Sequence, residues 1–131
     1  MKRILFLSAD PKQHKDLRPL LPDWTLFRTS TVEEASKILS REFGLIIVID
    51  LDPVTLGIDW INEAERLKAL FPGVPMIAVS STDDTEIIVK AYAAGIDELI
   101  LKPVEADELM ESIHRLMKKN QRFKKAMALL L

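Results

Sequence analysis

The chain contains no cysteine among its 131 residues, which excludes disulfides, thiolate nucleophiles and cysteine-ligated metals. It has only four glycines, and the first stands at position 44. The glycine-rich loops that bind dinucleotides or nucleotide phosphates after a first strand are therefore missing. The apolar run at residues 4–7 is too short for a signal-peptide core or a membrane span. We expect a cytoplasmic protein without a membrane partner.

The composition predicts one domain with a real hydrophobic core, since 48% of the residues are hydrophobic and 29% are charged. The net charge of −2 hides an asymmetry: residues 115–131 hold six basic residues and no acidic ones. A basic tail can bind nucleic acid or anionic lipid. The simpler interpretation is solvated helix charge, and we expect no nucleic-acid partner for this segment.

Apolar runs alternate with amphipathic segments five times along the chain. This alternation, with short connections, predicts a doubly wound α/β domain with a five-stranded parallel sheet of the flavodoxin-like type. The run at residues 45–49 is apolar throughout, which is typical of a central strand buried on both faces. The strands are expected at residues 4–7, 24–29, 45–49, 76–79 and 98–101.

Polar side chains follow four of these runs. Asp10 comes shortly after the first run, Asp50 and Asp52 after the third, Ser80 after the fourth and Lys102 after the fifth. The carboxyl ends of parallel strands share one edge of a sheet, where ligand sites lie in such folds. A carboxylate, a hydroxyl and an ammonium from three separate strands therefore make a specific candidate site.

Three segments, residues 45–50, 74–81 and 93–103, carry a family resemblance. They read LIIVID, VPMIAVSS and AAGIDELILKP, and the last is the most specific. The sequence resembles the receiver domain of two-component response regulators over roughly residues 2–118. We accordingly divide the chain into a receiver domain, residues 1–118, and an extension of its last helix, residues 119–131.

The resemblance implies roles for three side chains. Asp50 would be the phosphoacceptor, taking a phosphoryl group from a sensor histidine kinase. Ser80 would hold a phosphoryl oxygen, and Lys102 would pair with the carboxylate and then with the phosphoryl group. The Lys102–Pro103 bond is expected to be cis. Such a domain is a signalling module, a phosphoprotein rather than an enzyme.

The sequence departs from the family at the positions that normally carry two Mg²⁺-binding acids, which are Ser8 and Ala9 here. Mg²⁺ prefers oxygen ligands in octahedral geometry, and phosphoryl transfer depends on its charge. Only Asp50, Asp10 and Asp52 remain as candidate ligands for a weakened Mg²⁺ site. Asp10 can also be a helix N-cap, and Asp52 can be an ordinary loop acid. A second departure is Leu99, where many family members have an aromatic residue.

The last helix carries residues at alternating spacings of four and three, which is the seam of a coiled coil with one polar position. The first three of these residues suit packing on the sheet, whereas the later ones need a second chain or a downstream output domain. We expect dimerisation through this helix or a connection to an output domain. The seam consists of Leu109, Ile113, Leu116, Asn120, Phe123, Met127 and Leu130.

These features predict a receiver domain with compromised phosphorylation chemistry that acts as a protein-interaction and dimerisation module. A second hypothesis is a conventional phosphoreceiver that uses Asp10 or Asp52 as a substitute metal ligand. A third, from a different class, is a flavodoxin-like binder of a small ligand, because a fold does not fix a function.

Overall fold

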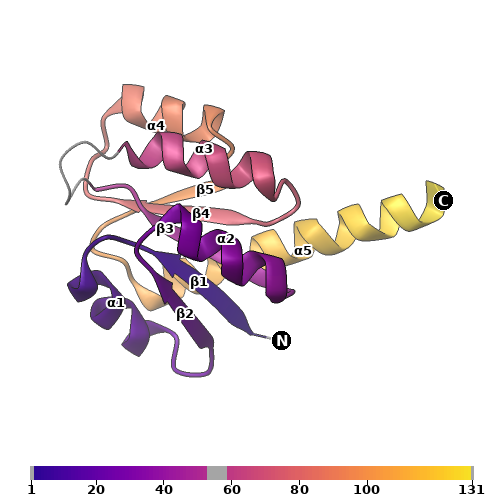
Figure 1. Ribbon diagram of the computed structural model, residues 1–131, viewed down its shortest axis with the longest axis horizontal. Coiled ribbons are helices and arrows are strands. Elements are labelled where there is room, and N and C mark those ends of the chain that lie inside the picture. The colour runs from indigo at the N-terminus through magenta and orange to yellow at the C-terminus, as the bar shows by residue number, and fades with distance from the viewer. Residues whose placement is uncertain (1, 53–58, 131) are drawn as a thin grey trace.

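The computed structural model describes residues 2–52 and 59–130, which form one parallel sheet of five strands flanked by helices (Figure 1). The strand order is β2-β1-β3-β4-β5, so the chain winds outward in both directions from β1 and β3. This confirms the doubly wound fold. The strands are β1 (Arg3–Leu7), β2 (Thr25–Thr29), β3 (Leu45–Asp50), β4 (Met76–Ser80) and β5 (Glu98–Leu101).

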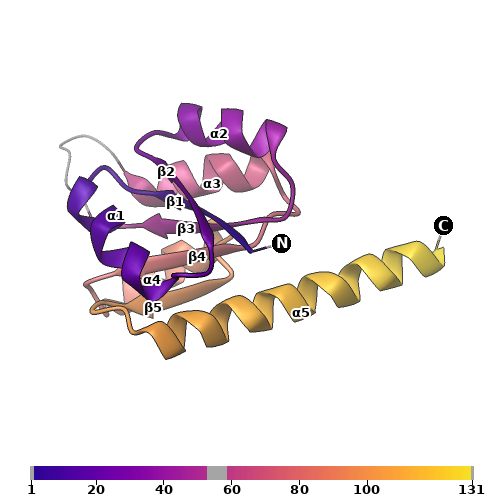
Figure 2. The same ribbon diagram turned by 90° about the horizontal axis from the view of Figure 1, so that it is seen from below.

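Helices cover both faces of this sheet. One face is packed by α1 and α5, and the other by α2 and α3, with α4 joining that side through Ala91 (Figure 2). The first four of these helices each connect one strand to the next parallel strand in the chain, whereas α5 follows the last strand. The helices are α1 (Pro11–Leu17), α2 (Val32–Arg41), α3 (Trp60–Leu70), α4 (Thr85–Ala93) and α5 (Ala106–Leu130), with a 3-10 turn at Arg18–Leu20.

The central strand is β3, which lies between β1 and β4 and is buried along its whole length. Its residue Ile49 pairs with Leu7 on one side and Ala78 on the other. This confirms the expectation drawn from the unbroken apolar run. The register also brings the ends of β1, β3, β4 and β5 to one edge of the sheet.

The first helix, α1, ends at Leu17, and a 3-10 turn follows it directly. Pro19 lies inside that turn. Proline has no backbone N–H, and its ring clashes with the preceding helical turn. The α-helix therefore ends shortly before Pro19. Leu17 and Leu21 still reach the core beneath α1.

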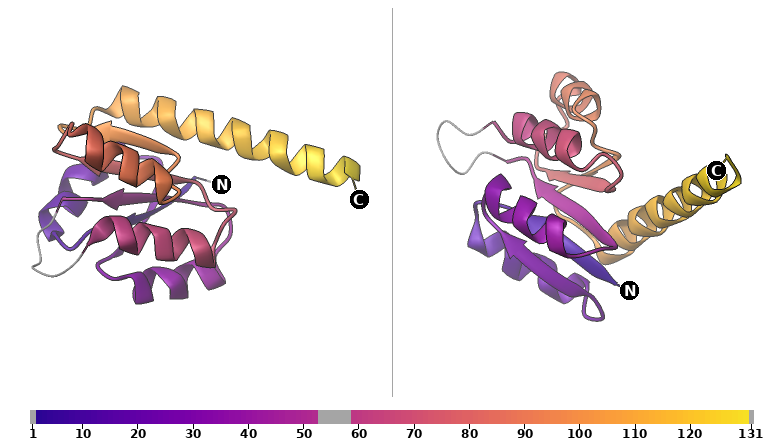
Figure 3. Two further views of the ribbon diagram at one scale, coloured as in Figure 1. Left: turned by 90° about the horizontal axis from the view of Figure 1, so that it is seen from above. Right: turned by 45° about the vertical axis from the view of Figure 1, so that its right-hand side comes forward.

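The helix α5 is continuous over 25 residues and extends far beyond the sheet (Figure 3). Its first part packs on the sheet through Leu109, Ile113 and Leu116. In its last turns Met127, Leu129 and Leu130 are exposed. The side chain of Phe123, also predicted to lie on the seam, is outside the described part of the structure. No helix within residues 2–52 and 59–130 is long and apolar enough to cross a membrane.

A polar cluster fixes α5 to the edge strand β5 before the helix leaves the sheet. The Ser112 hydroxyl donates to Glu98 at 2.7 Å, and the Arg115 guanidinium donates to the same carboxylate at 2.6 Å. Burial alone would raise the pKa of Glu98, but the hydrogen bonds from Arg115 and Ser112 outweigh it and lower the pKa below its ordinary value. The direction in which α5 projects is therefore set by this contact as well as by its apolar face.

Two glycines with positive φ allow a matched test of the turns before β3 and β5. Gly44 has φ +74° and open space where a Cβ would lie, whereas Gly95 has φ +105° and its Cβ would meet Lys68 Cγ at 2.6 Å. The ammonium of Lys68 is bound to the Val74 carbonyl at 2.9 Å and to Asp97 at 3.2 Å, so a shift of its stem would disturb these bonds.

We predict that Gly44→Ala lowers the free energy of unfolding by about 1 kcal/mol, the cost of a side chain in left-handed backbone. Gly95→Ala should cost more, because it adds a steric clash to the same backbone penalty. Urea denaturation of the two variants measures the difference. Equal losses would contradict the role of the Lys68 contact.

Candidate functional site

The candidate site lies at the edge where β1, β3, β4 and β5 end. Asp50 is the last residue of β3 and Ser80 the last of β4, while Ser8 and Lys102 directly follow β1 and β5. The Lys102–Pro103 peptide bond is cis, as expected. The structure therefore brings together the carboxylate, the hydroxyl and the ammonium that the sequence placed at separate strand ends.

Asp50 is buried, with 2% of its surface exposed, and both carboxylate oxygens accept hydrogen bonds. Its Oδ1 accepts from Lys102 Nζ at 3.0 Å and from the Asp52 backbone N–H at 3.0 Å. Its Oδ2 accepts from the Ser8 hydroxyl at 3.2 Å. Ser8 thus acts as a neutral donor to Asp50.

Asp52 lies in the same hydrogen-bond network, and its carboxylate accepts hydrogen bonds from three donors. Its Oδ2 accepts from Lys102 Nζ at 2.7 Å. Its Oδ1 accepts from the Ser81 backbone N–H at 3.0 Å and from the Ser80 hydroxyl at 3.4 Å. The sequence pointed to Asp52 only as a possible metal ligand or loop acid. It placed Ser81 at this edge through its position after the fourth strand, but not as a backbone donor to Asp52.

One ammonium lies between two carboxylates at this edge. Burial alone would lower the pKa of Lys102, but hydrogen bonds to Asp52 and Asp50, with their negative charges, outweigh it and raise the pKa. Burial would likewise raise the pKa of Asp52, yet the bonds from Lys102 and the Ser81 N–H lower it. Two carboxylates therefore share one ammonium at this edge of the sheet.

Asp10 has a local structural role at the start of α1. Its Oδ1 accepts from the Lys12 backbone N–H at 2.9 Å, the geometry of a helix N-cap. Its own N–H donates to the Ser8 hydroxyl at 3.1 Å. Ala9 has no side-chain oxygen. Among the described residues, no group of three or more histidine, aspartate or glutamate side chains is placed to hold a metal ion.

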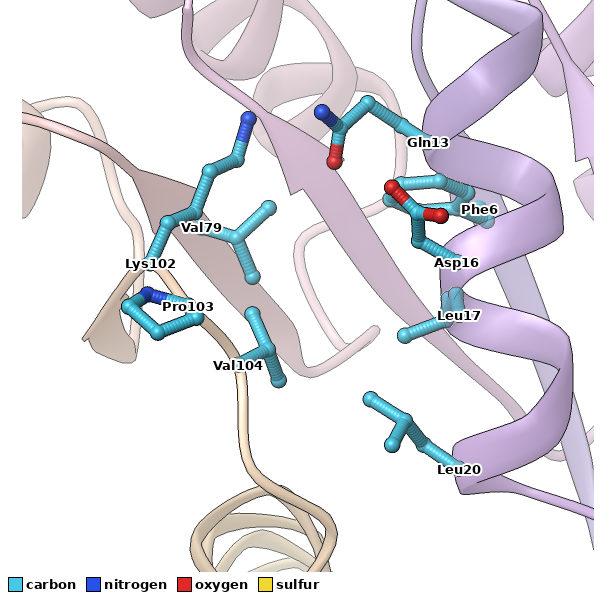
Figure 4. Close-up of a pocket in the computed structure, with 9 residues that line it drawn as sticks. All are labelled: Phe6, Gln13, Asp16, Leu17, Leu20, Val79, Lys102, Pro103 and Val104. Carbon is cyan, nitrogen blue, oxygen red and sulfur yellow. The ribbon is translucent and has the colours of Figure 1, made fainter.

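A cavity of about 260 Å³ with a mixed lining, which includes the polar side chains of Gln13 and Asp16, lies beside the site, between α1 and the connection from β5 to α5 (Figure 4). Leu17 and Leu20 line it from the α1 side, and Pro103 and Val104 from the other. The stem of Lys102 forms part of its wall, while its ammonium binds the two carboxylates. Asp50 does not line this cavity.

The comparison with known families identifies the family of this chain. The family model described as response regulator receiver domain matches residues 10–114. The chain belongs to this family. The match begins just after Ser8 and Ala9.

Relatives and solved structures agree with this assignment. The receiver domain is 31% identical over 101 residues to the C4-dicarboxylate transport transcriptional regulatory protein DctD of Rhizobium meliloti, covering 77% of this chain and 22% of DctD. A receiver domain protein of Methanospirillum hungatei has the same fold, with TM-score 0.79, 23% identity and coverage of 93% of this chain and 98% of that chain. NtrX of Brucella abortus matches with TM-score 0.86 at 19% identity, over 100% of this chain and 30% of that chain.

Lys102 is predicted to stabilise the receiver fold as the cation between Asp50 and Asp52. Lys102→Met should lower the free energy of unfolding by about 3 kcal/mol, because it leaves a buried carboxylate without its counter-charge. Lys118→Met, which removes an exposed lysine from α5, is the control and should change stability little. Urea denaturation measures both, and equal effects would contradict this role.

Proposed function

We propose that this receiver domain acts in two-component phosphorelay signalling as a protein-interaction and dimerisation module. Asp50 occupies the phosphoacceptor position, but its phosphorylation is strongly weakened. The observation that carries the proposal is the pairing of Asp50 with Lys102 and Ser8 at an edge that lacks the Mg²⁺-binding acid pair. Its partners would be a sensor histidine kinase or another signalling protein in the cytoplasm, and an output domain.

The oxygen ligands that the site offers support the proposal that Mg²⁺ binds only weakly. Mg²⁺ requires several oxygen ligands in octahedral geometry. The Ala9 side chain offers no oxygen. The Ser8 hydroxyl donates a hydrogen bond to Asp50, and the Asp52 carboxylate accepts one from Lys102. The residues present therefore do not fit this ion well, and the proposed function does not depend on it.

The charges of the site also oppose modification of Asp50. A phosphoryl group on Asp50 would add negative charge beside the Asp52 carboxylate, and Lys102 is the cation bonded to both. In the family a divalent ion neutralises such charge during transfer. Without a strong metal site, the acyl phosphate is disfavoured by repulsion in a buried setting.

We predict that incubation with acetyl phosphate, or with beryllofluoride, at millimolar Mg²⁺ gives no stable adduct on Asp50. The double variant Ser8→Asp/Ala9→Asp should gain the adduct, because it restores two carboxylates at the metal-binding positions. Intact-protein mass spectrometry detects the phosphoryl adduct, and fluorine NMR detects bound beryllofluoride.

Asp50→Asn in the double-variant background is the control and should abolish the adduct. Stable modification of the unaltered protein would contradict the proposal. It would instead support a conventional phosphoreceiver that uses Asp52 or Asp10 as a substitute ligand. In that case Asp52→Ala or Asp10→Ala would remove the modification.

The long helix supports a second part of the proposal, in which residues 1–118 form the receiver domain and residues 119–131 form a dimerisation or linker helix. Met127 and Leu130 lie on the predicted seam and are exposed, at 42% and 80%. Burying such side chains against a second copy is favourable. The likeness in fold to NtrX extends over the whole chain, including this part of α5, and that chain is much longer.

We predict that the protein is a dimer in sedimentation equilibrium and that Met127→Glu shifts it to the monomer. The charge would be placed on the apolar seam, where its burial is costly. Ala128→Glu adds the same charge at a neighbouring exposed position off the seam and should leave the dimer intact. A monomeric parent protein, or equal effects of the two variants, would contradict dimerisation through this helix.

A further inference from the structure

The Asp52 carboxylate binds three donors that come from the ends of two neighbouring strands. Lys102 Nζ, after β5, donates to Oδ2 at 2.7 Å. The Ser81 N–H and the Ser80 hydroxyl, at the end of β4, donate to Oδ1 at 3.0 and 3.4 Å. Both oxygens are thus held, each by a different strand end, and the side chain is 23% exposed.

If Asp52 were only a counter-ion for Lys102, its second carboxylate oxygen would not need further hydrogen-bond donors. Asp50 already pairs with Lys102 at 3.0 Å. The second oxygen of Asp52 is directed toward a backbone N–H and a hydroxyl, which carry no net charge. An ammonium, an N–H and a hydroxyl converging on two oxygens form the kind of donor set that binds an oxyanion.

We propose that Asp52 occupies, from within the chain, the place where this site would bind the oxygens of a phosphoryl group. This inference rests on the proposed assignment of Asp50, Ser80 and Lys102 to a phosphoacceptor site. The carboxylate is the built-in occupant of an oxyanion site, and it holds the end of β4 against the ends of β3 and β5. The site is therefore filled without phosphorylation.

The occupied site also fixes the start of the connection from β4 to α4. The Ser81 N–H is bound to Asp52, and the Thr82 N–H donates to the Ser80 hydroxyl at 3.2 Å. The connection then ends at Asp84, which caps α4 by accepting from the Glu86 N–H. The start of this connection is therefore held by a residue of the chain itself, Asp52.

Removing the carboxylate should open the site to a small tetrahedral oxyanion. In Asp52→Ala the Ser81 N–H and one side of the Lys102 ammonium lose their partner, so inorganic phosphate can bind them. Asp10→Ala is the matched control, because it removes an acidic charge from the same edge without freeing any of these donors.

The test is a titration with inorganic phosphate, without Mg²⁺, followed by the amide NMR signal of Ser81. We expect at least tenfold tighter binding in Asp52→Ala than in the unaltered protein, and no such gain in Asp10→Ala. Adding Lys102→Ala to Asp52→Ala should abolish the gain. The proposal would be overturned if the unaltered protein, Asp52→Ala and Asp10→Ala bound phosphate with equal affinity. It would also be overturned if the gain in Asp52→Ala persisted after Lys102→Ala was added.

Asp52→Asn provides a second variant that keeps the shape of the side chain and removes its charge. It should bind phosphate more tightly than the unaltered protein, because its amide pairs poorly with the ammonium, and unchanged affinity would count against the proposal. The outcome is separable from the proposed function. Adduct formation on Asp50 and sedimentation test the latter, while phosphate binding in these variants reports only on what fills the oxyanion site.

Discussion

The Lys102 ammonium, held between the carboxylates of Asp50 and Asp52, is the contact on which this edge of the molecule depends. It joins the end of β5 to the end of β3, and through Asp52 it reaches the end of β4. Asp50 is almost completely buried, so its charge is tolerated only because Lys102, Ser8 and a backbone N–H surround it. The parallel sheet brings these groups together, since all of its strands end at the same edge.

Under our proposal, this cluster changes the chemistry that the receiver fold offers. Where family members place acids for a divalent ion, Ser8 supplies a hydroxyl to Asp50 and Ala9 supplies nothing. Lys102 balances part of the negative charge of the carboxylates that a metal ion would otherwise balance. The donors that could bind an oxyanion are hydrogen-bonded to Asp52. We therefore interpret the domain as one whose shape and contacts carry the signal, with α5 as the element that reaches a second copy or an output domain.

The fold could be predicted from the sequence because it depends on patterns of many residues. The unbroken apolar run of β3 identified the central strand, and the strand ends identified Asp50, Ser80 and Lys102. The direction of the Asp52 side chain could not be predicted in this way. It depends on the distance between side chains of three strands, and a carboxylate two residues after Asp50 is equally compatible with a metal site, a cap or an ion pair.

The central claim is that Asp52 fills this site and that neither a metal ion nor a phosphoryl group does. The most direct measurement is a crystal structure of the unaltered protein grown with millimolar Mg²⁺ and beryllofluoride. Our account predicts that the Asp52 carboxylate lies between Lys102 and the Ser81 N–H, with Asp50 unmodified. An octahedral Mg²⁺ beside Asp50, with beryllofluoride bound to its carboxylate and Asp52 displaced from Lys102, would contradict it.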